Sequence, residues 1–458
     1  MKSTLYFFGG AGAVTGSNFM LESESQKILI DCGLFQGCNF CEDANYKAFP
    51  FEPKEISVLL VTHAHIDHIG RIPKLVKDGF KGKIISTKAT KALAAELLRD
   101  SMELLGREAE KLDRKPLYDE EDVMAALSVW DTVYYHEDIQ LQDGFTVRLL
   151  DAGHILGSAM VELRRQNEKG EMRKLVLTGD LGNDSSLLVG PTEVLSDVQY
   201  LVMESVYGDK VHEGIEDRTE RLEDIIENTM ARGGTLLIPA FSTERTQDLL
   251  FEIRELMVQK RIPSVPVFVD SPLALRVTEA FSANPDYFRD SIRERILGGE
   301  DIFKFPQLQF THTPDESKAL HAILGPKIII AGSGMSQGGR ILSHEKEYLA
   351  DPNSTLLIVG YQPAGSLGRR LLEGEKEVVI FKEKVKVRAR VLALYGYSAH
   401  RDSEGLVSFV HEATGAFEKI FVTMGEPKSS LFLVQRLRDF LGLQATAPLA
   451  SEKAELNL

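Results

Sequence analysis

The chain has 458 residues, and its 53 basic and 68 acidic residues give it a formal net charge of −15. This length predicts two or three domains, and 43% apolar and 26% charged residues are typical of a soluble globular protein. No run of 18 apolar residues is present, which excludes a membrane-spanning helix. The net acidity argues against a protein that coats nucleic acid without specificity, but it permits an enzyme with a local basic cleft.

The beginning of the chain and its cysteines predict a cytoplasmic protein. Met1-Lys2-Ser3 leads directly into a strand-like segment, so we expect no signal peptide and no membrane association. Three cysteines, Cys32, Cys38 and Cys41, cannot form a disulfide framework, and they lack the second Cys or His pair of a zinc knuckle. A reducing compartment suits such a chain.

Short apolar segments separated by turns predict antiparallel strands within the first 60 residues, at 4–10, 17–23 and 26–33. A buried strand at 57–65 comes next, and we expect a helix to begin near Asp67 or His68 and a long helix from about Lys88 to Lys111. Strands at 145–154, 174–180 and 200–205 complete this part of the chain. The alternation of strands and helices indicates the α/β class.

From residue 207 onwards, helices alternate with buried strands, which predicts a doubly wound parallel sheet. After about Lys386 the pattern of the first part returns. We therefore expect a discontinuous first domain of residues 1–206 and 386–458, with a second domain of residues 207–385 inserted into it.

The sharpest motif is His63-Ala64-His65-Ile66-Asp67-His68, which places three of the 11 histidines within six residues. In an extended segment after a strand, His63 and His65 point the same way and can hold one ion. Asp67 and His68, on the turn into a helix, can reach a second ion. Imidazole and carboxylate ligands together suit Zn²⁺, with Mn²⁺ as the alternative.

Four ligands do not complete two metal sites, so the remaining ligands should lie at the ends of other strands. Three residues have that placement: His154 follows the strand at 145–152, Asp180 follows the strand at 174–178, and His400 follows the segment at 391–397. Together with the motif they predict a centre of two metal ions built from seven side chains.

Ten stretches along the chain form a pattern known from one family: LIDCGLFQG, VTHAHIDHIGRIPKL, DAGHILGSAM, LTGDLGN, LVMESVYGDK, IPAFSTERTQDLL, VFVDSPLA, AGSGMSQGGRIL, VGYQPAGSLGRRLLEG and GYSAHRD. Through them the sequence resembles the metallo-β-lactamase superfamily, and within it the β-CASP nucleases of the RNA-processing branch. That branch includes bacterial and archaeal ribonucleases and the endonuclease subunit that cleaves eukaryotic pre-mRNA 3′ ends. The resemblance implies an αβ/βα metallo-β-lactamase sandwich with an inserted parallel-sheet α/β β-CASP domain.

The resemblance also implies a role for each residue of the centre. His63, His65 and His154 would hold one Zn²⁺, Asp67, His68 and His400 the other, and Asp180 would bridge the two. Asp31 would support these ligands from behind, and Glu204 would lie beside them, so that Asp31, Asp67, Asp180, Glu204 and His400 form the expected catalytic set. In this family a histidine at the position of His400 accompanies RNA substrates, whereas the DNA-repair branch typically carries valine.

The chain departs from the family at one position. Relatives that cleave pre-mRNA have a histidine where this chain has Arg370. Arginine stays protonated near pH 7 and is a poor proton donor, but its guanidinium group can bind a phosphate with two hydrogen bonds. We therefore expect Arg370 to contact substrate rather than to act as a general acid.

Other candidate substrate contacts lie in the second domain. Ser333, Gly334 and Arg340 belong to a glycine-rich loop between a strand and a helix, Ser271 follows another strand, and Arg369 precedes Arg370. Lys382, Lys384, Lys386, Arg388 and Arg390 alternate as on one face of a strand. For that run, a solvated strand face is the preferred interpretation and an RNA track is the alternative.

The sequence therefore predicts a zinc-dependent ribonuclease that hydrolyses RNA phosphodiester bonds in RNA processing or decay. Cleavage within the RNA, from its 5′ end, or both, stays open. A dizinc hydrolase that acts on DNA or on a small molecule is the alternative. RNA is the expected partner, and no association with a membrane is expected. Whether the chain forms a homodimer stays open.

Overall fold

The computed structural model describes residues 2–37, 41–183, 186–211, 216–360, 362 and 365–458. The chain divides into two compact units. The first unit consists of Met1–Asp184, Val189–Val211 and Ala399–Leu458, and the second of Ser185–Leu188 and His212–Ser398. Among the described residues, no helix is both long and apolar enough to cross a membrane.

The first unit contains two seven-stranded sheets. In one sheet the order is β22-β1-β2-β3-β4-β5-β6, with antiparallel pairs as far as β3 and parallel pairs from β3 to β6. Its strands are β1 (Lys2–Gly9), β2 (Asn18–Glu22), β3 (Lys27–Ile30), β4 (Val58–Leu60), β5 (Lys83–Thr87), β6 (Trp130–Val133) and β22 (Lys453–Asn457). The antiparallel start predicted from the sequence is confirmed.

In the other sheet of the first unit the order is β21-β20-β11-β10-β9-β8-β7. Its strands are β7 (Ile139–Gln140), β8 (Thr146–Asp151), β9 (Ala159–Gln166), β10 (Met172–Leu177), β11 (Tyr200–Met203), β20 (Lys419–Val422) and β21 (Ala445–Thr446). Alternate residues of β1 are buried, and Phe7 packs in one apolar core with Val161 of β9 and Phe421 of β20. The two sheets therefore face each other as a sandwich, because each buries its apolar face against the other.

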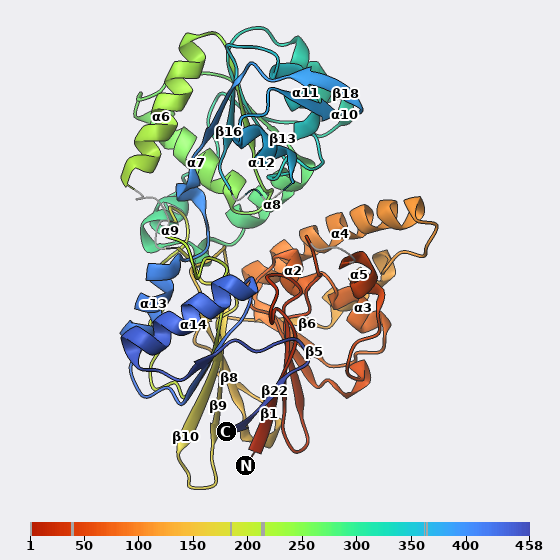
Figure 1. Ribbon diagram of the computed structural model, residues 1–458, viewed down its shortest axis with the longest axis vertical. Coiled ribbons are helices and arrows are strands. Elements are labelled where there is room, and N and C mark those ends of the chain that lie inside the picture. The colour runs from red at the N-terminus through yellow and green to blue at the C-terminus, as the bar shows by residue number, and fades with distance from the viewer. Residues whose placement is uncertain (1, 38–40, 184–185, 212–215, 361, 363–364) are drawn as a thin grey trace. The chain divides into compact units, whose positions relative to one another are not determined.

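Helices cover the outer faces of this sandwich (Figure 1). Beside the first sheet lie α1 (Cys41–Tyr46), α2 (Ile66–Ile69), α3 (Ile72–Lys77), α4 (Lys88–Lys111) and α5 (Glu120–Ser128), and beside the second lie α13 (Ser403–Glu412) and α14 (Pro427–Leu441). Leu406 of α13 and Leu433 of α14 pack against Val422 of β20 in a second apolar core. The arrangement is the αβ/βα sandwich that the sequence predicts.

The second unit has a six-stranded parallel sheet in the order β14-β13-β15-β12-β16-β19. Its strands are β12 (Thr235–Pro239), β13 (Val267–Asp270), β14 (Leu308–Phe310), β15 (Lys327–Ala331), β16 (Thr355–Ile358) and β19 (Arg390–Ala393), and a separate hairpin is formed by β17 (Glu377–Ile380) and β18 (Glu383–Lys386). The helices of this unit are α6 (Glu216–Ala231), α7 (Arg245–Val258), α8 (Pro272–Ser282), α9 (Asp290–Leu297), α10 (Pro314–Ala319), α11 (Ile341–Tyr348) and α12 (Leu367–Leu372).

Strand β19 differs from the sequence prediction. We expected the segment after Lys386 to belong with the first domain, but Arg390–Ala393 pairs in parallel with Thr355–Ile358 at the edge of the second unit's sheet. The apolar residues of this short strand fit either sheet, and only the tertiary fold decides its partner. The basic run at 382–390 is consequently not one strand: Lys384 and Lys386 lie on β18, and Arg390 begins β19.

Two glycines of the first unit allow close backbone contacts at the turns that carry the predicted ligands. A Cβ atom on Gly33 would lie 1.5 Å from the carbonyl oxygen of Asp67, and one on Gly182 would lie 1.8 Å from the carbonyl oxygen of Gly153. Gly33 follows β3, and Gly153 precedes His154. These contacts hold the turns that carry Asp67 and His154 against neighbouring segments.

We predict that Gly33→Ala destabilises the first unit and Gly106→Ala does not. The new Cβ on residue 33 must displace the backbone at Asp67, which should cost about 3 kcal/mol, as overpacking of a tight contact does. Gly106 lies within α4 with no atom within 4 Å of an added Cβ, so alanine should stabilise by about 0.5–1 kcal/mol. Urea unfolding followed by circular dichroism measures both changes, and equal stability of the two variants would contradict the prediction.

Candidate metal centre

The turn after β4 presents the histidine motif. His63 and His65 lie in the extended segment between Leu60 and α2, while Asp67 and His68 lie on α2, which begins at Ile66. The helix start predicted near Asp67 or His68 is therefore confirmed to within two residues. His63 and His68 are buried, and His65 and Asp67 are partly exposed.

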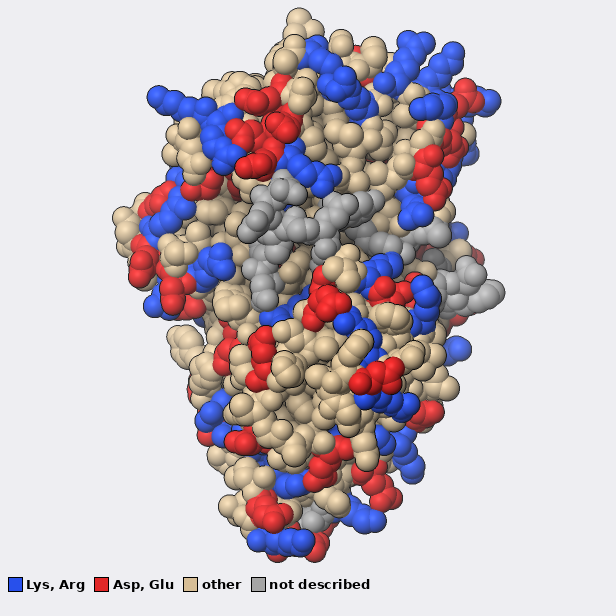
Figure 2. Space-filling view, turned by 60° about the vertical axis from the view of Figure 1, so that its left-hand side comes forward, with Lys and Arg blue, Asp and Glu red and all other residues tan. Residues whose placement is uncertain are grey.

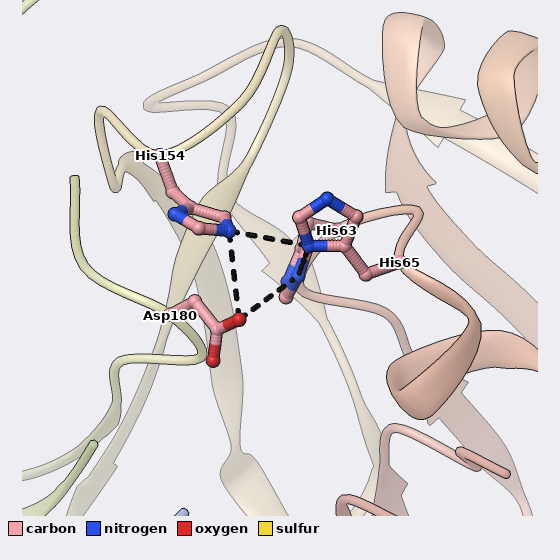
Figure 3. Close-up of side chains that lie close together, drawn as sticks. All are labelled: His63, His65, His154 and Asp180. Atoms are coloured by element: carbon pink, nitrogen blue, oxygen red, sulfur yellow. Dashed lines mark hydrogen bonds and ion pairs between the residues drawn. The ribbon is translucent and has the colours of Figure 1, made fainter. Parts of the chain in front are cut away.

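Four side chains from three separate segments meet at one point (Figure 3). His63 Nε2 lies 3.0 Å from His65 Nδ1, and His65 Nδ1 lies 3.2 Å from His154 Nε2. Asp180 Oδ2 lies 3.4 Å from His63 Nε2 and 3.5 Å from His154 Nε2. The ligand atoms of these four residues all lie within 4.8 Å of one another.

This arrangement fits a metal ion. Tetrahedral zinc with ligands at about 2.0–2.1 Å requires ligand atoms about 3.3 Å apart, which is close to the spacing found here. Imidazole nitrogens that face a common point cannot all satisfy one another by hydrogen bonds, whereas a cation satisfies them all. A buried group of three imidazoles and one carboxylate is thus suited to a divalent ion.

A second group shares Asp180. Ligand atoms of Asp180, Glu204 and His400 again lie within 4.8 Å of one another. His400 Nδ1 lies 3.1 Å from Glu204 Oε1, and His68 Nε2 lies 3.3 Å from Asp180 Oδ1. The two oxygens of Asp180 thus face different histidines.

Asp31 contacts the Nδ1 atom of His68 and fixes the orientation of its ring. Its Oδ2 atom lies 2.7 Å from His68 Nδ1 and accepts hydrogen bonds from Thr62 Oγ1 at 2.9 Å and Ser17 Oγ at 3.1 Å. Its Oδ1 atom accepts from the Thr62 backbone N–H at 2.9 Å. Sequence reasoning singled out Asp31 but missed Ser17 and Thr62, and only the position of Thr62 next to His63 could have indicated it.

Backbone contacts bring the distant ligands to this point. Gly182 and His400 form an isolated β-bridge, and the Asn183 N–H donates to the Ala399 carbonyl at 2.8 Å. Glu204 Oε1 accepts from the Leu181 N–H at 2.6 Å, and Glu204 Oε2 accepts from the Val206 N–H at 3.2 Å. The turn after Asp180 therefore positions both His400 and Glu204.

Burial and charge divide the histidines into two kinds. Burial and neighbouring imidazoles lower the pKa of His65 and of His154 well below the usual value, so both are neutral near pH 7. Burial also disfavours charge on His68 and His400, but nearby carboxylates outweigh it. Asp180 and Asp31 raise the pKa of His68 well above its usual value. Glu204 and Asp180 raise the pKa of His400 to about 9. Burial would raise the pKa of Asp180, yet His68 and His63 hold it well below its usual range.

The structure supports Asp67 as a metal ligand less clearly than it supports His63, His65 and His154. Burial raises the pKa of its carboxyl group, and the charge of His68 opposes this rise. Like His68, Asp67 belongs to neither of the two groups of converging ligand atoms found among the described residues. Its role as a ligand stays a prediction.

Several predicted substrate contacts gather around Asp270 in the second unit. The Arg340 guanidinium donates to Asp270 Oδ1 at 2.6 Å, and Ser271 Oγ caps α8 by accepting from the Ala274 N–H at 3.1 Å. His344 Nε2 lies 2.7 Å from Asp270 Oδ2. Although burial opposes it, hydrogen bonds from His344, Ser317, Thr311 and Arg340 hold the pKa of Asp270 below its usual range. Sequence reasoning missed Asp270, which ends β13.

The remaining candidates of the second unit have local partners. Ser333 Oγ donates to the Gly338 carbonyl at 3.3 Å, and the Gly334 carbonyl accepts from Gln362 at 2.8 Å. Arg369 pairs with Glu373 at 2.7 Å. Residues 361, 363 and 364 of the same motif lie outside the described residues.

Arg370 forms a two-point ion pair with Glu375, at 2.6 and 2.8 Å. The pair is more than a third exposed, so water and salt weaken it. A phosphate that approached Arg370 would have to compete with this carboxylate. The role of Arg370 in substrate binding stays a prediction.

Comparison with known proteins gives three family matches. The metallo-beta-lactamase superfamily matches residues 11–154, the Beta-Casp domain matches residues 246–371, and the Zn-dependent metallo-hydrolase RNA specificity domain matches residues 384–448.

Individual relatives cover most of the chain. Ribonuclease TTHA0252 of Thermus thermophilus is 37% identical over 88% of this chain and 89% of its own length. Transcription termination factor FttA of Methanosarcina mazei is 28% identical over 96% of this chain and 69% of its own length, and an RNase J-like protein of Methanocaldococcus jannaschii is 29% identical over 97% of both. A solved structure of a protein of unknown function from Enterococcus faecalis V583 covers 100% of both chains with a TM-score of 0.55 at 14% identity, which shows a shared fold.

We predict that Asp31→Asn weakens metal binding. The amide keeps the size of the side chain but loses the negative charge that holds His68, and loss of such a supporting contact typically costs about tenfold to a hundredfold in metal affinity. Competition with a chromogenic chelator measures the affinity. Asp131→Asn is the matched control, because Asp131 is exposed and pairs with Lys83. Equal affinity of the two variants would show that Asp31 does not support a ligand.

We also predict that metal binding releases about two protons per chain at pH 7.5. The raised pKa values keep His68 and His400 protonated at that pH in the metal-free protein, and a ligand nitrogen must lose its proton. The release should fall as the pH rises through about 9, where His400 is already neutral. Calorimetry in buffers of different ionisation enthalpy counts the protons. His400→Ala should remove one of them, and an unchanged count would exclude His400 as a ligand.

Proposed function

The chain belongs to the β-CASP family of metallo-β-lactamase hydrolases, and we propose that it is a metal-dependent ribonuclease. The observation that carries this proposal is the convergence of His63, His65, His154 and Asp180 on one point, in a chain that is 37% identical to a ribonuclease over most of its length. RNA phosphodiester bonds are the proposed substrate, cut within the RNA or also from its 5′ end.

We propose that the metallo-β-lactamase domain comprises residues 1–206 and 399–458 and the β-CASP domain residues 207–398, because β19 pairs in the sheet of the second unit. The family matches at residues 11–154 and 246–371 support this assignment. Cytoplasmic location and a homodimer stay predictions from the sequence.

We propose two Zn²⁺ ions per chain, with Mn²⁺ as the alternative. One would be held by His63, His65 and His154, the other by Asp67, His68 and His400, with Asp180 shared. The separate directions in which the two oxygens of Asp180 face support a shared ligand. When bound, such ions lower the pKa of water and neutralise charge that develops on a phosphoryl group.

Glu204 and His400 act as a pair in this proposal. Glu204 is buried, and two backbone N–H groups fix its carboxylate, so it can accept a hydrogen bond from His400 Nδ1 without moving. That bond sets the ring orientation of His400. It leaves Nε2 as the nitrogen that can bind a metal ion or exchange a proton with the substrate. Asp31 does the same for His68.

The choice of RNA rests on His400, since the position carries histidine in the RNA-processing branch. Arg340, Arg369 and Arg370, with Ser271, Ser333 and Gly334, are the proposed contacts to flanking phosphates. Each arginine also has a carboxylate partner, so phosphate must replace that partner or share the guanidinium group.

The test is incubation of the Zn²⁺-loaded protein with a 5′-labelled linear RNA and with an internally labelled circular RNA. We expect cleavage of the linear RNA, and cleavage of the circle shows that the enzyme cuts internal bonds. Asp180→Asn should lower the rate by about a hundredfold or more, because it removes the carboxylate that both groups share.

The exposed variant Asp131→Asn, prepared in the same way, should cleave like wild type. If Asp180→Asn and wild type cleaved at equal rates, the activity would not come from this centre, and the proposed function would be wrong.

A further inference from the structure

The β17–β18 hairpin ends in a turn with an unusual sequence. Ile380 pairs with Glu383, so the turn consists of Phe381 and Lys382 alone. Both residues have positive φ, 49° and 66°. Such two-residue turns favour Asn and Gly, and a bulky side chain at positive φ is strained. Packing does not explain the choice, because the Phe381 side chain is 56% exposed.

A firm base supports this strained tip. Val378, Ile380 and Val385 are buried, and they share one apolar core with Ile341 of α11 and Leu371 of α12. The opposite face of the hairpin carries Val379, which is 55% exposed, opposite Lys384. The hairpin thus holds an aromatic ring and basic side chains in water on a packed support.

The hairpin region is positively charged in an acidic protein. Residues 376–390 include six basic and two acidic side chains, whereas the whole chain has a net charge of −15. Over the face shown in Figure 2, basic and acidic side chains are mixed.

Neighbouring carboxylates do not cancel this local charge, because each already has a basic partner. The pairs are Glu373–Arg369, Glu375–Arg370, Glu377–Lys384 and Glu383–Lys346. Within the described part of the chain, Lys382, Lys386 and Arg388 form no ion pair. These three cations are therefore available to an anion.

A pocket of about 410 Å³ lies directly beside the tip. Its walls are partly apolar and partly polar, and they include Phe381, Val379, Leu342, Gln337 and Ser366. This volume lies within the range of pockets that bind small molecules, so a nucleobase fits it. Gln337 and Ser366 offer hydrogen-bonding groups, and Phe381 offers a flat ring.

We propose that the β17–β18 tip is a contact site for single-stranded RNA, in which a base stacks on Phe381 and Lys382 and Lys386 bind the adjacent phosphates. The proposal rests on the proposed function and adds a site to it. An aromatic ring among unpaired cations is the combination that binds single strands without sequence specificity. A docking surface for a protein would instead be poor in lysine at its centre.

Fluorescence anisotropy with a labelled 20-nucleotide RNA tests the stacking contact. Every variant is made in the full chain on an Asp180→Asn background, in which cleavage should be about a hundredfold slower, and a denaturing gel after the measurement at 4 °C checks that the RNA is intact. Phe381→Leu keeps an apolar side chain but removes the ring, and it should weaken binding by about fivefold to a hundredfold, as loss of one stacked base does. Phe381→Trp should bind at least as well as wild type. Leu324→Ala is the control, because Leu324 is a 93% exposed apolar residue of the same unit.

The salt dependence tests the phosphate contacts. Each phosphate contact to a single strand contributes about 0.7 to the slope of log K against log salt. Lys382→Ala with Lys386→Ala should therefore reduce the slope by about 1.4. Lys318→Ala, at an exposed lysine that pairs with Asp315, should leave the slope unchanged.

A third variant separates function from stability. Phe381→Asn with Lys382→Gly supplies the residues that the turn favours, so the protein should melt at a higher temperature than wild type while it binds RNA more weakly. A purely structural role of Phe381 predicts the opposite change in melting temperature.

Two further results distinguish this proposal from the proposed function. If the chain hydrolyses bis(p-nitrophenyl) phosphate but does not cleave RNA, the proposed function fails, and the anisotropy data still decide the hairpin site. If Phe381→Leu and the double lysine variant bind RNA like wild type, the hairpin proposal is wrong. Altered sedimentation of these variants, with unchanged RNA affinity, would assign the tip to contact with a second copy of the chain and would equally overturn it.

Discussion

The centre of the first unit depends on the carboxylate of Asp180. Five imidazoles brought together inside a protein raise the free energy if they carry charge or face one another without donors. Asp180 opposes this, since one of its oxygens faces His63 and His154 and the other faces His68. Asp31 and Glu204 extend the arrangement by one carboxylate behind each of the two outer histidines. Acidic and basic groups thus alternate through the site.

The fold makes this alternation possible because strands from distant parts of the chain end at the same place. His63 follows β4, His154 follows β8, and Asp180 follows β10. Gly33 and Gly182 let neighbouring backbones approach to distances that any side chain would prevent. The small residues near the ligands are therefore as necessary as the ligands, although they contribute no chemistry.

Sequence reasoning could predict the metal ligands because histidine is a rare residue and several of these ligands lie close together in the sequence. The His63 to His68 motif and the strand-end positions of His154, Asp180 and His400 could be read directly. Ser17 and Thr62 could not, because a hydroxyl group near a strand is common and only the tertiary fold brings them to Asp31. Strand β19 was misassigned for a related reason, since its short apolar segment fits either sheet and only the tertiary fold pairs it with β16.

The basic side chains of the second unit also show what residue type alone cannot predict. Arg340, Arg369 and Arg370 were chosen from the sequence as phosphate contacts, yet each lies against a carboxylate. Lys382 and Lys386 looked like an ordinary solvated strand face, yet they remain without ion pairs beside an exposed aromatic ring, within the described residues. In a protein with a net charge of −15, acidic side chains outnumber basic ones and many cations lie beside a carboxylate. The cations that matter to a polyanion are those the fold keeps apart from carboxylates, and this separation is a property of three-dimensional packing that residue type alone does not reveal.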